Sequence, residues 1–305
     1  MNIMVTGGKG YMGRYIVEEL LKEGHTVINY NRDMSLPFEN PKNIFVIGEL
    51  SDIPRLITTI QEHKVDRIIH TAAQSHPDIS LVMPVGTVEA NTMGLLSVFE
   101  AARLTGIKRI VCYSSDAAYG HAKVDVVTED QPLCPRTPYG VTKATAEMMA
   151  RAYNWSFGMD IISLRSCAVY GPGQVMPEFA RDAIKAAVAG EKYSLPRGRD
   201  QKFNMVFITD VVNASIKACF SEKRSDLSAY NISSGYQPTF GEILDIIKEI
   251  IPTADFEVGP GDIEGWDVHG FFSIKAAEED LGYKPEVSLE KGMKLYIDWL
   301  KAHTF

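Results

Sequence analysis

The sequence predicts an α/β fold, a doubly wound parallel sheet followed by a smaller C-terminal α/β lobe. Short apolar runs alternate with helical patterns as far as residue 165. A glycine-rich stretch at residues 6–13 directly follows the first apolar run. Beyond Gly173 the strict alternation of strand and helix stops. Such alternation is typical of parallel sheets with helices on both faces, and its loss indicates a second unit.

The composition is that of an ordinary globular protein. The 305 residues are 45% hydrophobic and 23% charged, with a formal net charge of −8, which argues against a general nucleic-acid or anionic-membrane partner. No signal peptide, membrane span or metal site is expected. The cysteines form no CxxC pair, so we expect free thiols and a cytoplasmic location. They are Cys112, Cys134, Cys167 and Cys219.

The glycines near the N-terminus predict a dinucleotide site. An apolar run at residues 3–5 breaks into them, and a helical pattern follows to about Gly24. In this order Gly7 permits a tight turn, Gly10 lets the backbone approach a pyrophosphate, and Gly13 allows close helix packing. The helix N-terminus would hold the phosphates, as in a Rossmann-type fold; the alternative is a plain turn. The expected phosphate contacts are Gly7, Gly10, Tyr11, Met12 and Gly13.

The end of the second predicted strand bears on the choice of cofactor. Residues 27–30 form the strand, and Asn31, Arg32 and Asp33 follow it. An acidic residue here binds the ribose hydroxyls of NAD, whereas an arginine accommodates the 2′-phosphate of NADP. Uncharged Asn31 and cationic Arg32 favour NADP, while Asp33 keeps NAD open. A plain surface role for Arg32 is a further alternative.

The next elements complete the first half of the predicted sheet. We expect strands at residues 44–47, 65–73 and 109–115 and helices near residues 56–60 and 91–105, the last ending at a glycine. In open α/β sheets, ligands bind outside the carboxyl ends of the strands. The further residues expected at the cofactor are Glu49, Leu50, Thr71, Ala72, Ala73 and Asn91.

A tyrosine and a lysine are the candidate catalytic pair. Tyr139 and Lys143 lie one turn apart on a helix predicted over residues 139–155. A neighbouring ammonium favours the phenolate, so Lys143 is expected to lower the pKa of Tyr139. Taken alone, this spacing is typical of two residues on a solvated helix face. The dinucleotide motif earlier in the chain favours the catalytic interpretation. Ser115 and Asp116 follow the fifth strand at the same edge.

The C-terminal part mixes strands and helices less regularly. We expect strands at residues 161–165, 205–208 and 230–232 and helices at residues 178–189, 210–220, 240–251 and 289–302. The predicted domains are residues 1–170 for dinucleotide binding, with about 203–235 returning to it, and residues 171–305 mainly for a substrate-binding lobe.

The sequence resembles the extended short-chain dehydrogenase/reductase family, the NAD(P)-dependent sugar epimerase/dehydratase group. The resemblance covers essentially the whole chain, in residues 6–13, 70–73, 114–120, 139–143, 164–165, 169–173 and 281–285. It implies Tyr139 as the acid/base, Lys143 as a ribose ligand and Ser115 as the hydroxyl that hydrogen-bonds the reacting oxygen; Tyr139 and Lys143 would both contact the cofactor.

Three positions depart from the pattern that the resemblance implies for a nucleotide-sugar substrate. Ala168 replaces a frequent asparagine, Phe203 replaces a usual arginine, and residues 261–275 contain no arginine. These departures favour a substrate without a nucleotide diphosphate, although Arg197 and Arg199 could bind phosphate from another direction. The expected substrate contacts are Ser75, Ser115, Asp116, Ala168, Arg197 and Phe203.

The function implied is that of an NAD(P)-dependent epimerase or oxidoreductase acting on a secondary hydroxyl of a sugar through a keto intermediate. Ala117 replaces the glutamate that dehydratases of the family carry, and Asp116 has an acid role or a capping role. The alternatives are a net dehydrogenase or reductase of a small polyol or sugar acid, a nucleotide-sugar 4-epimerase, and a cofactor-binding sensor without catalysis.

A homodimer is also expected. The helices predicted at residues 91–105 and 139–155 resemble those that pair across a two-fold axis in this family. Their apolar residues Phe99, Met148 and Met149 fit such an interface. The alternative is that these side chains pack on the chain's own sheet.

Overall fold

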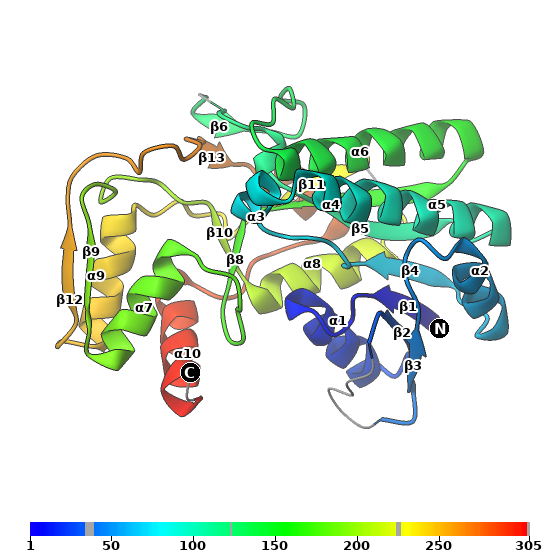
Figure 1. Cartoon of the computed structure of the whole chain (residues 1–305), viewed down its shortest axis with the longest axis horizontal. Coiled ribbons are helices and arrows are strands. Elements are labelled where there is room, and N and C mark those ends of the chain that lie inside the picture. The colour runs from blue at the N-terminus through cyan, green and yellow to red at the C-terminus, as the bar shows by residue number, and fades with distance from the viewer. Residues whose placement is uncertain (34–39, 123, 224–226, 304–305) are drawn as a thin grey trace.

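A seven-stranded parallel sheet forms the centre of the molecule (Figure 1). The computed structural model describes residues 1–33, 40–122, 124–223 and 227–303. In spatial order the strands are β3 (Asn43–Ile47), β2 (Thr26–Asn31), β1 (Asn2–Thr6), β4 (Arg67–His70), β5 (Arg109–Ser115), β7 (Asp160–Ser166) and β11 (Ala229–Ile232). The order reverses between β1 and β4, and such a switch point is where doubly wound folds bind their ligands.

Side chains of the central strands alternate between two cores, as the period of two requires. One core receives Met4, Ile28, Ile68, Ile110 and Ile161. The other receives Ile3, Val27, Ile69, Val111 and Ile162. Both faces of the sheet are therefore apolar, which explains the nearly continuous hydrophobic runs of these strands.

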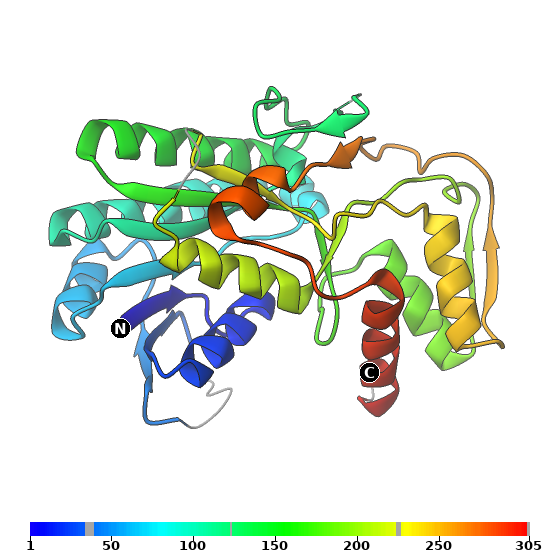
Figure 2. The ribbon, with the colours of Figure 1, turned by 180° about the vertical axis from the view of Figure 1, so that it is seen from behind.

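Helices cover both faces of the sheet (Figures 1 and 2). The core with Ile3 is closed by α1 (Tyr11–Lys22) and α8 (Ile208–Phe220), which pack together. The core with Met4 is closed by α2 (Ile53–Glu62), α5 (Gly94–Thr105) and α6 (Pro138–Phe157). Thr137 caps α6 by accepting a hydrogen bond from the Gly140 amide at 3.1 Å, which starts this helix directly before Tyr139.

The C-terminal lobe lies beside the sheet and is seen at the left of Figure 1. Its helices α7 (Phe179–Ala189), α9 (Phe240–Ile250) and α10 (Leu289–Ala302) pack on one another. Its core is continuous with the core under α1 and α8. The lobe also contains the strand pair β9 (Lys192–Leu195) with β12 (Asp255–Val258). Two further pairs lie outside the main sheet: β8 (Ala168–Tyr170) with β10 (Met205–Phe207), and β6 (Val126–Val127) with β13 (Phe271–Phe272).

The predicted fold class is confirmed, with local corrections. The fourth strand ends at His70, so residues 71–73 are a loop rather than strand. A π-helical turn, η1 (Glu89–Met93), precedes α5, where one continuous helix was expected. β10 pairs with β8 outside the main sheet, although β11 does join it. The predicted domain boundaries stay a prediction.

Several short elements were not predicted. They are α3 (Pro77–Val82), α4 (Pro84–Val88), the 3-10 turn η2 (Asp116–Ala118), the π-helical turn η3 (Ala277–Leu281) and strands β6, β8, β9, β12 and β13. Their brevity leaves too few residues for a periodic pattern. Within the described part of the chain, no helix is both long and apolar enough to cross a membrane.

Candidate active site

The glycine loop between β1 and α1 is shaped by close backbone contacts. Gly7 has φ +73°, and a Cβ there would stand 2.8 Å from the Ala72 Cα atom. A Cβ on Gly13 would stand 2.2 Å from the Gly7 carbonyl oxygen. Gly10 is the N-cap of α1 and provides no side-chain cap. The first turn of α1, with Tyr11 and Met12, therefore presents backbone N–H groups that fit the pyrophosphate of a dinucleotide.

The residues after β2 form a polar edge beside the glycine loop. Buried Asn31 accepts a hydrogen bond from the Lys9 amide at 3.2 Å and donates one to Asn29 at 2.5 Å. Lys9 Nζ forms an ion pair with Asp33. Arg32 is exposed, and among the described residues it has no hydrogen bond or ion pair. Lys9 is thus a second cation at this edge, which the sequence analysis missed.

Glu49 and Leu50 lie at the end of β3, next to the same edge. The Tyr30 hydroxyl donates to the Glu49 carbonyl oxygen at 2.9 Å, whereas the Glu49 side chain is exposed. Leu50 contacts Gly94 at the start of α5, where a Cβ would stand 3.0 Å from the Leu50 Cδ1 atom. The segment is therefore fixed through its backbone and through Leu50.

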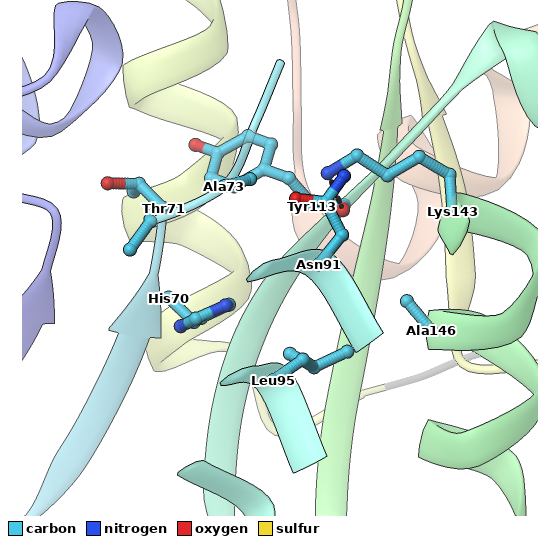
Figure 3. Close-up of a pocket in the computed structure, with 9 residues that line it drawn as sticks. His70, Thr71, Ala73, Asn91, Leu95, Tyr113, Lys143 and Ala146 are labelled. Carbon is cyan, nitrogen blue, oxygen red and sulfur yellow. Dashed lines mark hydrogen bonds between the residues drawn. The ribbon is translucent and has the colours of Figure 1, made fainter. Parts of the chain in front are cut away.

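A small cavity lies where the loop after β4 faces α5 and α6 (Figure 3). Its lining includes the predicted residues Thr71, Ala72, Ala73, Asn91 and Lys143, and four that were not predicted: His70, Leu95, Tyr113 and Ala146. Figure 3 shows Lys143 extending from α6 toward Asn91 and the backbone of Tyr113. The structure thus brings together residues from β4 and the loop after it, η1, α5, β5 and α6.

Asn91 and Lys143 are held in place by hydrogen bonds. The Asn91 amide donates to the Gln74 carbonyl oxygen at 2.9 Å and to Thr142 Oγ1 at 3.1 Å, and it accepts from the Gln74 amide at 2.7 Å. Lys143 Nζ donates to the Tyr113 carbonyl oxygen at 2.9 Å. Asn91 therefore joins η1 to α6 one residue before Lys143.

Tyr139, Ser115 and Asp116 meet at the carboxyl end of β5. Ser115 Oγ donates to Asp116 Oδ1 at 2.8 Å, and the Ala117 amide donates to the same carboxylate oxygen at 2.9 Å. Ser115 is the N-cap of η2, and the Asp116 carboxylate also accepts a hydrogen bond from the first turn, so the acid role of Asp116 and its capping role both stay predictions. Burial raises the pKa of Asp116, although the charge of His269 opposes that rise.

We expected Lys143 to lower the pKa of Tyr139, but in this structure that pKa is raised. Burial raises the pKa of Tyr139 well above its usual value, and only a hydrogen bond with Ser115 opposes that rise. Burial also lowers the pKa of Lys143 to about 8. The Lys143 ammonium lies 5.5 Å from the centre of the Tyr139 ring and is directed to the Tyr113 carbonyl. Tyr139 is therefore a protonated, neutral phenol at pH 7.

A buried ion pair anchors the helix that carries Tyr139. Glu147, one turn beyond Lys143, accepts from Arg165 Nε at 2.9 Å and from Nη2 at 2.6 Å. Both side chains are 4% exposed. Arg165 also donates to the Tyr119 hydroxyl. The network joins α6 to β7 and fixes the catalytic helix against the sheet.

The predicted substrate residues are more scattered. Ser75 is exposed in the loop before α3, and Ala168 lies on β8. Phe203 is only 5% exposed, inside a group of aromatic side chains. Arg197 is exposed, with its guanidinium against Gly261: a Cβ on that glycine would stand 2.8 Å from Nη2. These four residues come from separate segments, and none of them lines the small cavity beside Lys143.

Sequence reasoning missed side chains whose position only the fold defines. His70 Nδ1 and Thr6 Oγ1 share a hydrogen bond of 2.7 Å. Burial lowers the pKa of His70 to about 3. Glu147 repeats the spacing from Tyr139 to Lys143, a signal that could have found it. His269 lies in the lobe, and nothing in the nearby sequence links it to Asp116.

Comparison with known proteins agrees with this geometry. Residues 3–233 match the family described as the NAD dependent epimerase/dehydratase family. A putative UDP-glucose 4-epimerase of Methanocaldococcus jannaschii is 30% identical, and the match covers 98% of each chain.

Solved structures give the same result. A UDP-glucose 4-epimerase of Thermotoga maritima, crystallised with UDP-glucose, superposes with a TM-score of 0.90 at 27% identity and 99% coverage of both chains. A UDP-glucose 4-epimerase of Thermus thermophilus in complex with NAD gives a TM-score of 0.88 at 26% identity and 100% coverage of both. The chain therefore belongs to the NAD-dependent epimerase/dehydratase family and is an enzyme of the extended short-chain dehydrogenase/reductase type.

Proposed function

We propose that this enzyme epimerises a sugar or sugar derivative by oxidising a secondary hydroxyl to a ketone and reducing it again, with Tyr139 as the acid/base. The observation that carries the proposal is the meeting of Tyr139, Ser115 and Lys143 at the carboxyl edge of the sheet, beside a glycine loop that fits a dinucleotide. Bound NAD(P) would accept the hydride and return it.

The residues of the chain would handle the proton. In the reduction, Tyr139 donates its phenolic proton to the carbonyl oxygen, and its raised pKa means that this proton is present at neutral pH. In the oxidation, the same oxygen takes the proton of the substrate hydroxyl. Ser115 positions the reacting oxygen, and its hydrogen bond with Tyr139 favours the phenolate as it forms, while Lys143 would bind the cofactor ribose. Gly7, Gly10 and Gly13 bring backbone N–H groups to the phosphates.

A Tyr139→Phe variant tests the role of the tyrosine. It should lower the turnover number by roughly a thousandfold, within the range of general acid/base catalysis, and leave cofactor affinity unchanged because only the phenolic proton is lost. Activity within about tenfold of wild type would refute the assignment. Lys143→Ala should weaken both turnover and cofactor binding.

Retention of cofactor separates epimerisation from the alternatives. An epimerase regenerates its cofactor in each cycle and has no need to release it, whereas a net dehydrogenase or reductase of a polyol or sugar acid must release it. Purified protein that keeps its cofactor through gel filtration supports the epimerase. A sensor without catalysis would retain full cofactor binding in Tyr139→Phe and show no turnover in the wild type.

NADP is the proposed preference over NAD. Arg32 is exposed and lacks an ion pair among the described residues, so its cation is available to a 2′-phosphate. Asp33, paired with Lys9, is the feature that favours NAD.

A homodimer in the cytosol is the proposed physiological form. Val82 on α3, Val85 on α4 and Met148 on α6 are 83%, 69% and 58% exposed, so these helices present apolar side chains to solvent. Phe99, in contrast, is fully buried, and its predicted place in an interface is wrong. The four cysteines are free thiols, which suits a reducing compartment. Light scattering that gives a strict monomer would exclude the dimer.

A further inference from the structure

Four aromatic rings form one group in the C-terminal lobe. We call Phe179, Phe203, Phe240 and Trp266 the aromatic wall. The ring centres of Phe179 and Trp266 are 4.6 Å apart, those of Phe203 and Trp266 are 5.9 Å apart, and those of Phe203 and Phe240 are 5.8 Å apart. Phe203 and Phe240 are buried, whereas Trp266 is 42% exposed. Trp266 is thus open to a ligand, and Phe179, which it contacts, is half-buried.

The segment after Trp266 joins the aromatic wall to the catalytic hydroxyls. Asp267 and His269 both lie within electrostatic reach of Asp116, which accepts the hydrogen bond of Ser115. His269 Nδ1 is buried and has no hydrogen-bond partner among the described residues. Gln237 holds the segment by donating to the His269 carbonyl oxygen at 3.0 Å. The wall and the catalytic residues therefore flank the same segment.

The charges near this segment do not suit a diphosphate. Two phosphate groups are normally met by arginine, whose planar fork matches their oxygens. Here Arg136 is paired with Asp267 at 2.8 Å, Arg181 with Asp182 at 2.9 Å, and Arg199 with Asp245 at 2.9 Å. Exposed Arg197 lies against Gly261 in the loop after β12.

The helix ends beside the wall are also closed to phosphate. The N-terminus of α7 is capped by the Glu178 carboxylate, which accepts from the Ala180 amide at 3.1 Å and from the Arg181 amide at 3.2 Å. The N-terminus of α9 is closed by a capping box between Thr239 and Glu242. A phosphate at either end would have to displace a carboxylate of the chain itself.

We infer that the substrate is a sugar or polyol without a nucleotide diphosphate, whose apolar face packs on Trp266 and Phe179 and whose hydroxyls are bound by Asp116 and His269. The inference rests on the proposed function, since it names the substrate class of the same site. It separates this chain from the Thermotoga maritima relative, which was crystallised with UDP-glucose.

The test is calorimetry on the cofactor-loaded enzyme with uridine, thymidine and guanosine diphosphates. The wild type should bind none of them in the micromolar range. Trp266→Arg, at a half-exposed position, should bind uridine diphosphate at least roughly tenfold more tightly than wild type, about 1.4 kcal/mol. Trp155→Arg is the matched control: Trp155 is 92% exposed near the end of α6, and the change should leave nucleotide binding as in wild type.

Two results would overturn the inference. Micromolar binding of any nucleoside diphosphate to the wild type, weakened by Arg197→Ala, would show that the lobe holds a diphosphate through that arginine. A Trp266→Arg variant that gains no affinity over Trp155→Arg would show that the aromatic wall does not face the ligand. Failure of the proposed function is distinct, because it would appear as unchanged turnover in Tyr139→Phe.

Discussion

A Cβ on Gly13 would stand 2.2 Å from the Gly7 carbonyl oxygen, whereas one on Gly265 in the lobe would meet nothing within 4 Å. The cofactor edge is built from backbone held close to backbone, both within the glycine loop and between Gly7 and Ala72. The aromatic wall is built from side chains of four separate segments. Close backbone contacts require glycines, which can be recognised in the sequence. Contacts between side chains of distant segments produce no local sequence pattern. The two regions should therefore respond to substitution differently.

The buried ion pair below the catalytic helix should give the largest effect on stability. Arg165→Met leaves Glu147 charged and buried, which should lower the free energy of unfolding by about 3–5 kcal/mol. Lys294→Met, in the exposed pair with Asp298 on the lobe helix α10, should change it by less than about 0.5 kcal/mol. Urea unfolding measures both. Equal effects would show that burial does not make the Arg165–Glu147 pair more important to stability than an exposed pair.

The buried histidine beside the cofactor edge predicts acid sensitivity. The folded-state pKa of His70 is about 3, below its unfolded value of 6.5, so the unfolded chain binds this proton first as the pH falls. Stability from His70 is thus complete above pH 6.5 and is lost toward pH 3, by an amount on the order of 4 kcal/mol. Asparagine does not titrate. The free energy of unfolding of His70→Asn should therefore change less between pH 6.5 and pH 3 than that of the wild type. Parallel curves would contradict the prediction.

A larger side chain in the tightly packed glycine loop should lower the affinity for the cofactor. Gly13→Ala forces the loop away from Gly7 and should weaken NAD(P) binding by roughly 10–100-fold, about 1.4–2.7 kcal/mol. Gly86→Ala, in α4, would meet only the flexible end of Met83 at 3.7 Å and should leave binding unchanged. Fluorescence titration compares the two. An effect of similar size in both variants would mean that close backbone approach does not set the affinity.

The smallest expected effect is on the choice of cofactor. Arg32→Ala should reduce the preference for NADP over NAD by about 1 kcal/mol, because an exposed cation contributes little through solvent. Arg151→Ala, an exposed arginine on α6, serves as the control. Titration of each variant with both cofactors gives the ratio. Tighter NAD binding in the wild type, unchanged by Arg32→Ala, would end the proposal.

The order of the main strands and helices could be predicted from the sequence because their hydrophobic runs are long and regular. Strands β1, β2, β3, β5, β7 and β11 and helices α1, α6 and α10 lie within a few residues of their predicted bounds. The short elements α3 and α4 could not be predicted, since two prolines define them and no period does. Phe99 shows the same limit: its apolar character was evident, but the face on which it packs was not.

The sequence by itself determined the family, the dinucleotide loop and the pairing of Tyr139 with Lys143, because each depends on residues that are neighbours in the chain. Only the tertiary structure decided their electrostatics and surroundings. Burial raises the pKa of Tyr139 despite the adjacent Lys143, and Glu147 finds Arg165 across the core. The meeting of Trp266 with Phe179, and of His269 with Asp116, likewise depends on packing between distant segments, and no local spacing encodes such packing.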